Sequence, residues 1–267
     1  MNTLAVFRRE WIGKRNLFLL ATGEGLLLLF AYLYDPAMRA GSDKGAAMAV
    51  FGSLMFVWVC AALFGATMIG KELEERRFGF FLNRPLHPAE IFFGKVTAGL
   101  AQALLAGLLT CLPWLLGGGW QGLALVEAGR LVSAWLLGGL FLLLLLHAVS
   151  IQARSKAPWL LLDLAAWGGC LWGCWSLFRK LALSGVGFEH AVRFAGGVFA
   201  AMTLGLLVSG YLQVAQGRSD LRRGHRWVSL AMALTIGVTL FAGWGYTTWA
   251  IHSGAKTIKA VAHSRGK

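Results

Sequence analysis

The sequence predicts an all-α membrane protein, a polytopic transmembrane bundle of six to seven spans with an amphipathic amino-terminal interfacial helix. Of its 267 residues, 57% are hydrophobic and only 14% are charged, whereas soluble domains carry about 25% charged residues. The apolar residues gather in runs of about 20, the length at which a helix crosses the hydrocarbon core with its backbone hydrogen bonds satisfied. The 35 Gly and 12 Trp suit close helix packing and the membrane interface.

Seven apolar runs are candidate spans. They cover approximately residues 17–34, 47–70, 96–117, 130–151, 158–178, 193–215 and 228–251. A cleaved signal peptide is disfavoured in the first run, because Glu24 interrupts it and no small-residue cleavage site follows. No soluble domain is evident, so residues 1–267 are expected to form a single transmembrane domain.

Residues 1–16 are predicted to form a cytoplasmic interfacial helix. Leu4, Phe7 and Trp11 recur at helical spacing, and basic residues surround them. Such a helix lies on the membrane surface with its cations near anionic head groups.

The distribution of Lys and Arg predicts the orientation. With the amino terminus inside, 15 of the 25 Lys and Arg residues fall in inner segments and 6 in outer loops. The inner residues are Arg8, Arg9, Lys14, Arg15, Lys71, Arg76, Arg77, Arg84, Lys95, Arg154, Lys156, Arg218, Arg222, Arg223 and Arg226. Because cytoplasmic loops are enriched in these residues, we expect a multi-pass protein of the bacterial inner membrane with a cytoplasmic amino terminus. The remaining four lie in the basic tail, residues 252–267, which this topology places in the periplasm.

Two further functions are disfavoured by the same patterns. The net charge of +13 lies in short clusters between apolar runs, so it does not indicate a surface for nucleic acid. The four Cys residues all fall within apolar runs, where a thiol usually behaves as a small hydrophobic group. No metal site is expected.

The longest polar interruption, residues 71–95, carries the functional argument. It continues the second span as a helix in which Glu72 and Arg76 have the favourable order for an ion pair. Proline residues then bend the chain, and Pro88 suits the first position of a new helix with Glu90 in its first turn. Charges mixed with aromatic residues outside the membrane suggest a protein-docking surface. The alternative is an interfacial elbow whose aromatics dip into lipid.

The run from Gly70 to Lys95, GKELEERRFGFFLNRPLHPAEIFFGK, resembles the intracellular segment of ATP-binding-cassette type-2 permeases. The matching residues are Glu75, Gly79, Phe80, Phe81, Leu82, Pro85, Glu90, Ile91, Gly94 and Lys95. The chain departs from the family pattern at Phe78, which precedes Gly79 with no Thr after it, and at His87, where Ser or Thr usually caps the helix. A seventh span would also depart from the usual six.

The resemblance implies the membrane subunit of an exporter, working as a homodimer or a paired permease with a separate cytoplasmic ATPase. The residues it implicates in docking and coupling are Glu72, Glu75, Arg77, Phe80, Arg84, Pro85, Pro88 and Glu90. The chain has no G-x-x-x-x-G-K-[ST] phosphate-binding loop. It is therefore expected not to be an enzyme and to hold no cofactor, with ATP and Mg bound by the partner.

Three ionisable residues lie within the apolar runs, where such groups are costly and often functional. Glu24 is a candidate to line a transport path or to pair with another helix. His147 and Asp163 lie towards the cytoplasmic ends of their runs, close to each other if the two helices pack. For these two, a structural hydrogen bond or snorkelling to the interface is the favoured interpretation.

Other classes of function remain open at this point. A secondary transporter or channel would be built from inverted repeats and broken helices with polar residues at mid-membrane, and only Glu24 is a candidate. A membrane scaffold whose basic tail anchors a periplasmic partner is a further alternative. An embedded enzyme would need a catalytic constellation, which the sequence does not display.

Overall fold

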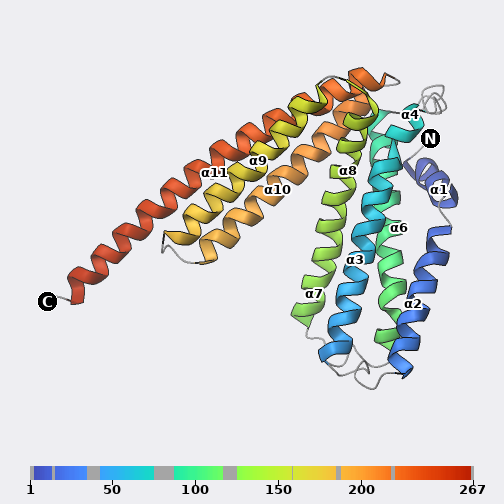
Figure 1. The fold of residues 1–267 in the computed structure, drawn as a ribbon, viewed down its shortest axis with the longest axis horizontal. Helices are drawn as coiled ribbons and strands as arrows, with labels where there is room; N and C mark the ends of the chain where they lie inside the picture. The colour runs from blue at the N-terminus through green and yellow to red at the C-terminus, as the bar shows by residue number, and fades with distance from the viewer. Residues whose placement is uncertain are drawn as a thin grey trace.

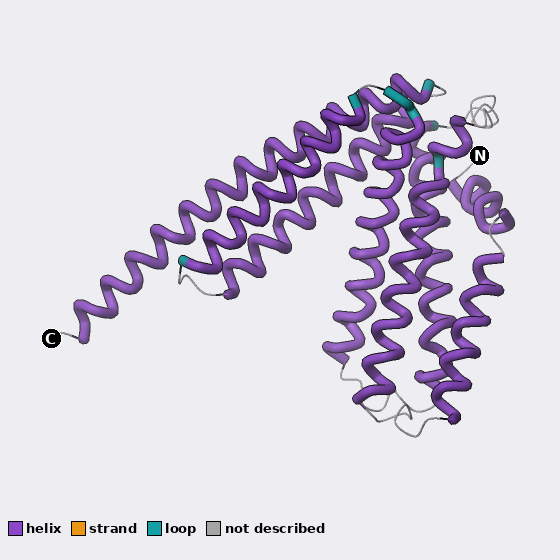
Figure 2. Tube along the Cα trace, in the orientation of Figure 1, coloured by secondary structure: helices purple, strands orange, loops and turns teal. Residues whose placement is uncertain are grey.

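The computed structural model describes residues 3–13, 16–34, 43–74, 87–116, 125–157, 159–184, 188–217 and 220–265. Nearly all of these residues are helical, and no strand occurs among them (Figure 2). The α-helices are α1 (Thr3–Gly13), α2 (Asn16–Tyr34), α3 (Asp43–Met68), α4 (Gly70–Glu74), α6 (Pro88–Leu116), α7 (Leu125–Ser133), α8 (Gly139–Arg154), α9 (Leu160–Leu183), α10 (Phe188–Leu212) and α11 (Leu221–Arg265). Two π-helical turns, η3 (Ala134–Gly138) and η4 (Gln213–Gly217), precede α8 and follow α10.

The long helices form two groups that diverge from one end of the molecule (Figure 1). The first group contains α2, α3, α6 and α8, and the second contains α9, α10 and α11. The groups meet at what we call the junction end. It carries α1, α4, the last turn of α8 and the first turns of α6, α9 and α11.

Six helical stretches are long and apolar enough to cross a membrane, so the chain is a multi-pass membrane protein. They are Ala49–Leu73, Pro88–Leu112, Ala128–Arg154, Leu160–Leu183, Glu189–Gln216 and Leu221–Ser253. Each overlaps one of the predicted runs. The first predicted run is the 19-residue helix α2, which packs on α6 so closely that a Cβ at Gly25 would lie 2.7 Å from the Leu109 carbonyl oxygen. Its role as a seventh span stays a prediction.

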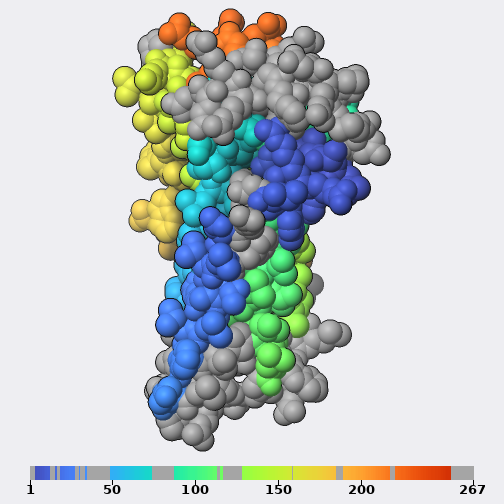
Figure 3. Space-filling model, turned by 90° about the vertical axis from the view of Figure 1, so that its right-hand side faces the viewer, coloured from blue at the N-terminus to red at the C-terminus, as the bar shows by residue number. Residues whose placement is uncertain are grey.

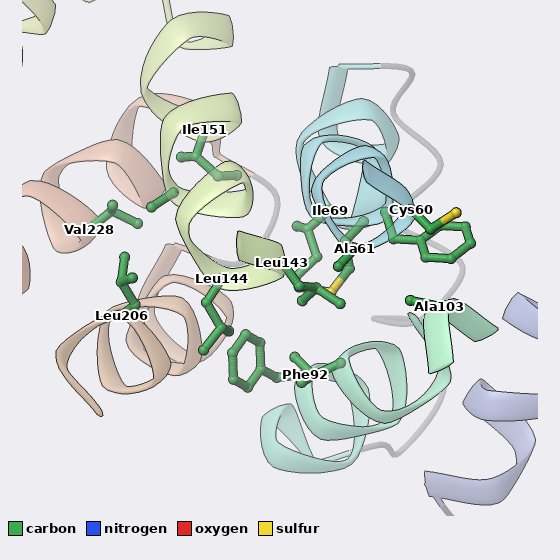
Figure 4. Packing of buried hydrophobic residues seen from close by; sticks show 14 of the residues in the cluster. Cys60, Ala61, Ile69, Phe92, Ala103, Leu143, Leu144, Ile151, Leu206 and Val228 are labelled. Atoms are coloured by element: carbon green, nitrogen blue, oxygen red, sulfur yellow. The ribbon is translucent and has the colours of Figure 1, made fainter. Parts of the chain in front are cut away.

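Helix α8 joins the two groups through a continuous hydrophobic core. In Figure 4, Leu143 points towards α3, whereas the next residue, Leu144, points towards Phe92 of α6 and Leu206 of α10. All four side chains are fully or almost fully buried. Leu143 and Leu144, which are consecutive in α8, therefore pack into the cores of the first and second groups.

The closest helix packing lies between α3 and α8. A Cβ at Gly65 would lie 2.0 Å from the carbonyl oxygen of Leu143, so only glycine allows this approach. Nearer the junction end, the Ser150 hydroxyl of α8 donates a 2.6 Å hydrogen bond to the Ala66 carbonyl of α3. This bond satisfies a carbonyl at the end of α3, where the last turn of a helix lacks partners of its own.

The π-helical turn η3 was not predicted from the sequence, and its geometry explains one buried contact. The indole nitrogen of Trp58 donates a 3.3 Å hydrogen bond to the Ala134 carbonyl at the start of this turn. A π-helical turn shifts the carbonyls out of the regular ladder, which leaves this one able to accept a bond from α3.

The structure adjusts three details of the sequence predictions. The helix continuing the second span is interrupted at Ile69, so Glu72 lies on the short helix α4. Residues 252–265, predicted as a tail, continue α11. A helix is present at α1, with Val6 rather than Leu4 as its buried residue, and its amphipathic interfacial character stays a prediction.

We predict that Gly65→Ala lowers the thermal stability of the purified chain in detergent. The added methyl group meets backbone, which cannot rotate away, and overpacking of this kind costs about 1–3 kcal/mol. Gly169→Ala is the matched control, because no atom lies within 4 Å of a Cβ there. Equal melting temperatures for the two variants would contradict the close approach of α3 and α8.

Candidate functional site

Two reciprocal hydrogen bonds cap the amino-terminal end of α6. The His87 imidazole accepts a 3.3 Å hydrogen bond from the Ala89 backbone N–H, and the Glu90 carboxylate accepts a 3.1 Å bond from the His87 backbone N–H. This pattern is a capping box, with His87 in the place where Ser or Thr is usual. Together with Pro88 at the first helical position, it defines where the segment that precedes α6 must end.

A buried lysine connects the helices on either side of that segment. The Lys95 side chain on α6 is completely buried, and its ammonium lies 2.6 Å from a carboxylate oxygen of Glu10 on α1. Glu72 on α4 lies 3.0 Å from the same nitrogen, as an ion pair whose geometry is not that of a hydrogen bond. Burial of a lone ammonium is very costly, and the two carboxylates offset that cost.

A second polar contact holds α1 in place. The side-chain amide of Gln102, two turns along α6 from Lys95, donates to the backbone carbonyls of Glu10 and Trp11 at 3.3 and 3.4 Å. These carbonyls are near the end of α1, where the last turn of a helix has no N–H donors of its own to pair with them. In Figure 3, α1 lies over the first group, beside the cyan surface of α3 and α4.

Glu10, Glu72 and Lys95 form an ion-pair cluster at the junction end, which we call the charged anchor. It joins α1, α4 and α6, and α4 and α6 are the helices that flank residues 75–86. Any force applied to that intervening stretch therefore reaches three helices at once.

The structure describes three of the eight residues predicted to dock an ATPase. Glu72 belongs to the charged anchor, and Pro88 and Glu90 form the start of α6. The other five, Glu75, Arg77, Phe80, Arg84 and Pro85, lie outside the described residues. Lys95 belongs to the motif but was not predicted as a site residue. The sequence feature that points to it is its position as a lone lysine at the start of an apolar run.

Two of the intramembrane candidates do not converge on a common site. Glu24 on α2 is half-buried and lies near Cys60 of α3. His147 is fully buried against Phe92, with ring centroids 6.2 Å apart. Neither imidazole nitrogen has a hydrogen-bond partner in the described part of the chain.

Asp163 pairs with a histidine that the sequence analysis did not single out. Its carboxylate lies 2.5 Å from Nε2 of His225 on α11, and the other ring nitrogen lies 2.5 Å from the Ser155 hydroxyl at the end of α8. All three side chains are buried. The expected neighbour, His147, is not part of this network. The signal for His225 was its place at the start of the last apolar helix, within a basic segment.

The hydrogen bonds of Ser155 decide what this network can do. Its hydroxyl donates to the Gln152 carbonyl at 2.9 Å and accepts from the Ala157 N–H at 3.3 Å. The network is fully satisfied when His225 donates from both nitrogens, to Ser155 and to Asp163. These hydrogen bonds tie the end of α8, the first turn of α9 and the first turn of α11 together.

A cavity of about 950 Å³ opens beside this network, between the α8–α9 turn and α11. Its lining combines basic residues, three Trp and aliphatic side chains. The described residues contain no cluster of three or more His, Cys, Asp or Glu that could hold a metal ion.

No family model, curated protein or solved structure matches the chain. The six apolar helices define it as a multi-pass α-helical membrane protein. Its resemblance to type-2 permeases rests on residues 70–95 and stays a prediction.

We predict that Lys95→Met strongly lowers the thermal stability of the purified chain. The substitution leaves two partly buried carboxylates without the buried cation that they share, and breaking a buried pair costs about 3–5 kcal/mol. The exposed Lys71→Met on α4 is the matched control. Combining Lys95→Met with Glu10→Gln and Glu72→Gln is expected to recover most of the loss. Equal melting temperatures for the Lys95 and Lys71 variants would contradict the charged anchor.

Proposed function

We propose that this chain is the membrane subunit of an ATP-driven exporter, and that a separate ATPase binds the segment of residues 71–95. The observation that carries the proposal is the charged anchor, in which Lys95 connects α6 with α1 and α4. A segment that transmits force from a motor must have both of its ends attached firmly to the helices that it moves. Here the two flanking helices share one buried cation.

The anchor also suggests how movement would pass into the membrane. Helix α4 is separated from α3 by the interruption at Ile69, so it can tilt as a short lever. Displacement of Glu72 would pull on Lys95, and through it on α6 and on Glu10 of α1. The same motor stroke would therefore act on α6, the third predicted span, and on α1.

Charge supports a cytoplasmic position for the junction end. Basic residues described at this end include Arg8, Arg9, Lys71, Arg154, Lys156, Arg222, Arg223 and Arg226. The opposite ends of the two groups carry Arg130, Arg179, Lys180 and Arg193, together with Lys44 at the start of α3 and Lys256, Lys259 and Arg265 in the last turns of α11. Over the whole sequence, the segments on the junction side hold 15 Lys and Arg against 6 in the outer loops. Since cytoplasmic segments are richer in Lys and Arg, the connecting segments favour the cytoplasmic amino terminus in a bacterial inner membrane. An ATPase would have access from that side.

A second permease subunit is part of the proposal. Only 11% of the apolar stretch of α9 is buried within the chain, compared with 61% for α6. The exposed apolar faces of α9, α10 and α11 suit lipid and a second subunit. A homodimer or a paired permease would cover part of them.

The proposal predicts that Glu75→Arg and Phe80→Asp abolish assembly with the ATPase encoded beside this chain. Charge reversal and a buried acid would each disrupt a docking surface, while membrane insertion would be retained. The measurements are co-purification from detergent and stimulation of ATP hydrolysis, which we expect to fall at least tenfold.

Glu189→Arg and Leu183→Asp serve as matched controls, because both residues are about 75% exposed at the end of the second group opposite the junction end. They are expected to leave assembly unchanged. Full assembly and stimulation in both segment variants would remove the docking role and, with it, the exporter assignment.

A further inference from the structure

The cavity between the α8–α9 turn and α11 has a strongly basic mouth. Four cations line it, Lys156 from the turn and Arg222, Arg223 and Arg226 from the first turns of α11. The mouth lies at the amino-terminal ends of α9 and α11, where the helix dipole favours an anion. One carboxylate also lines the cavity, that of Asp163, and it is already paired with His225.

Two buried polar groups in the wall lack partners. The Gln152 side chain is 3% exposed, and its amide nitrogen has no hydrogen-bond partner in the described part of the chain. The same holds for the hydroxyl of Ser229. Both residues line the cavity. Buried polar groups are normally satisfied, so these two unpaired donors in the wall indicate that the cavity takes a polar ligand group.

Beyond the cations, the wall becomes apolar. Leu162 and Ala166 of α9 face the cavity together with Leu230, Ala233 and Ile236 of α11, so this part extends along two helices that span the membrane. Three tryptophans, at 159, 167 and 227, also line it. Trp and cationic side chains are typical of protein surfaces at the level of the lipid head groups, and an aliphatic groove beside them suits an acyl chain.

Lys156 occupies an unusual backbone position. Its φ of 49° makes it the one non-glycine residue with positive φ in the described part of the chain. It directly follows Ser155, the residue that ends α8, where glycine is the usual choice. A lysine at this strained position suggests that its ammonium has a use at the cavity mouth.

We propose that this cavity binds an anionic membrane phospholipid, with the phosphate held by the cationic mouth and by Gln152 and Ser229. One acyl chain would lie along the apolar groove between α9 and α11. The volume of about 950 Å³ falls within the range of sites for small ligands. The inference requires only that the chain spans a membrane, so it stands or falls independently of the exporter proposal.

The test measures the affinity of the purified full chain for fluorescently labelled phosphatidylglycerol and for phosphatidylcholine of the same chain length. We expect phosphatidylglycerol to bind at least tenfold more tightly. Each cation near an anionic lipid contributes about a fivefold gain in affinity. Lys156→Gly should therefore weaken binding about fivefold while relieving the backbone, and Arg222→Gln with Arg226→Gln should weaken it about 30-fold.

Control variants and competitors distinguish the contributions of the local charge, the shape of the groove and the source of the phosphate group to binding. Arg179→Gln with Lys180→Gln removes the same charge from the far end of α9 and should leave affinity unchanged. Ala233→Trp fills the apolar groove and should block lipid binding, whereas Val238→Trp, on an exposed face of α11, should not. Inorganic phosphate and glycerol phosphate should compete only weakly, because neither fills the groove.

Three results would overturn the proposal. One is equal affinity for the two lipids. Another is a loss with the Arg222 and Arg226 changes no larger than with the Arg179 and Lys180 changes. The third is displacement of the lipid by inorganic phosphate at equal concentration, which would make the cavity a site for soluble phosphate.

Discussion

A single buried ammonium constrains the junction end of this protein. Lys95 has no exposed surface, and its charge is tolerable because Glu10 and Glu72 come to it from two other helices. The pairing positions α1 and α4 against α6, and this in turn determines where residues 75–86 begin and end. Away from that end, the first group depends on close backbone contact, as at Gly65 against α8, and on the core that α8 shares with both groups.

The sequence predicted the class of fold well, because hydrophobic runs of spanning length are a strong signal. Six runs became spanning helices, and α6 begins at Pro88 as the proline and Glu90 indicated. The partners of the polar residues could not be predicted. Asp163 bonds His225, 62 positions away, and only the packing of α9 on α11 brings them together. The π-helical turns, one of which carries the carbonyl bonded by Trp58, leave no periodic trace in the sequence.

The two polar features of the junction end serve different purposes in this account. The charged anchor is closed, because its cation is completely buried and lies within 3.0 Å of both carboxylates. The cavity beside His225 is open, with cations at its mouth and two buried donors that have no hydrogen-bond partner among the described residues. The closed charged anchor suits the transmission of force between helices, whereas the open cavity suits the binding of a ligand. Their common location at the basic end of the bundle means that a docked partner and a bound lipid could influence one another through α8.

An ATPase can reach residues 71–95 only if the junction end faces the cytoplasm, and cysteine labelling tests this directly. The four native cysteines are first replaced by alanine. A single cysteine is then introduced at exposed His87 on the junction end or at exposed Arg130 on the opposite end of the first group. A membrane-impermeant maleimide is predicted to label the His87→Cys chain only in inverted vesicles and the Arg130→Cys chain only in intact spheroplasts. Labelling of the His87→Cys chain from outside intact spheroplasts would contradict the orientation and the proposed ATPase contact.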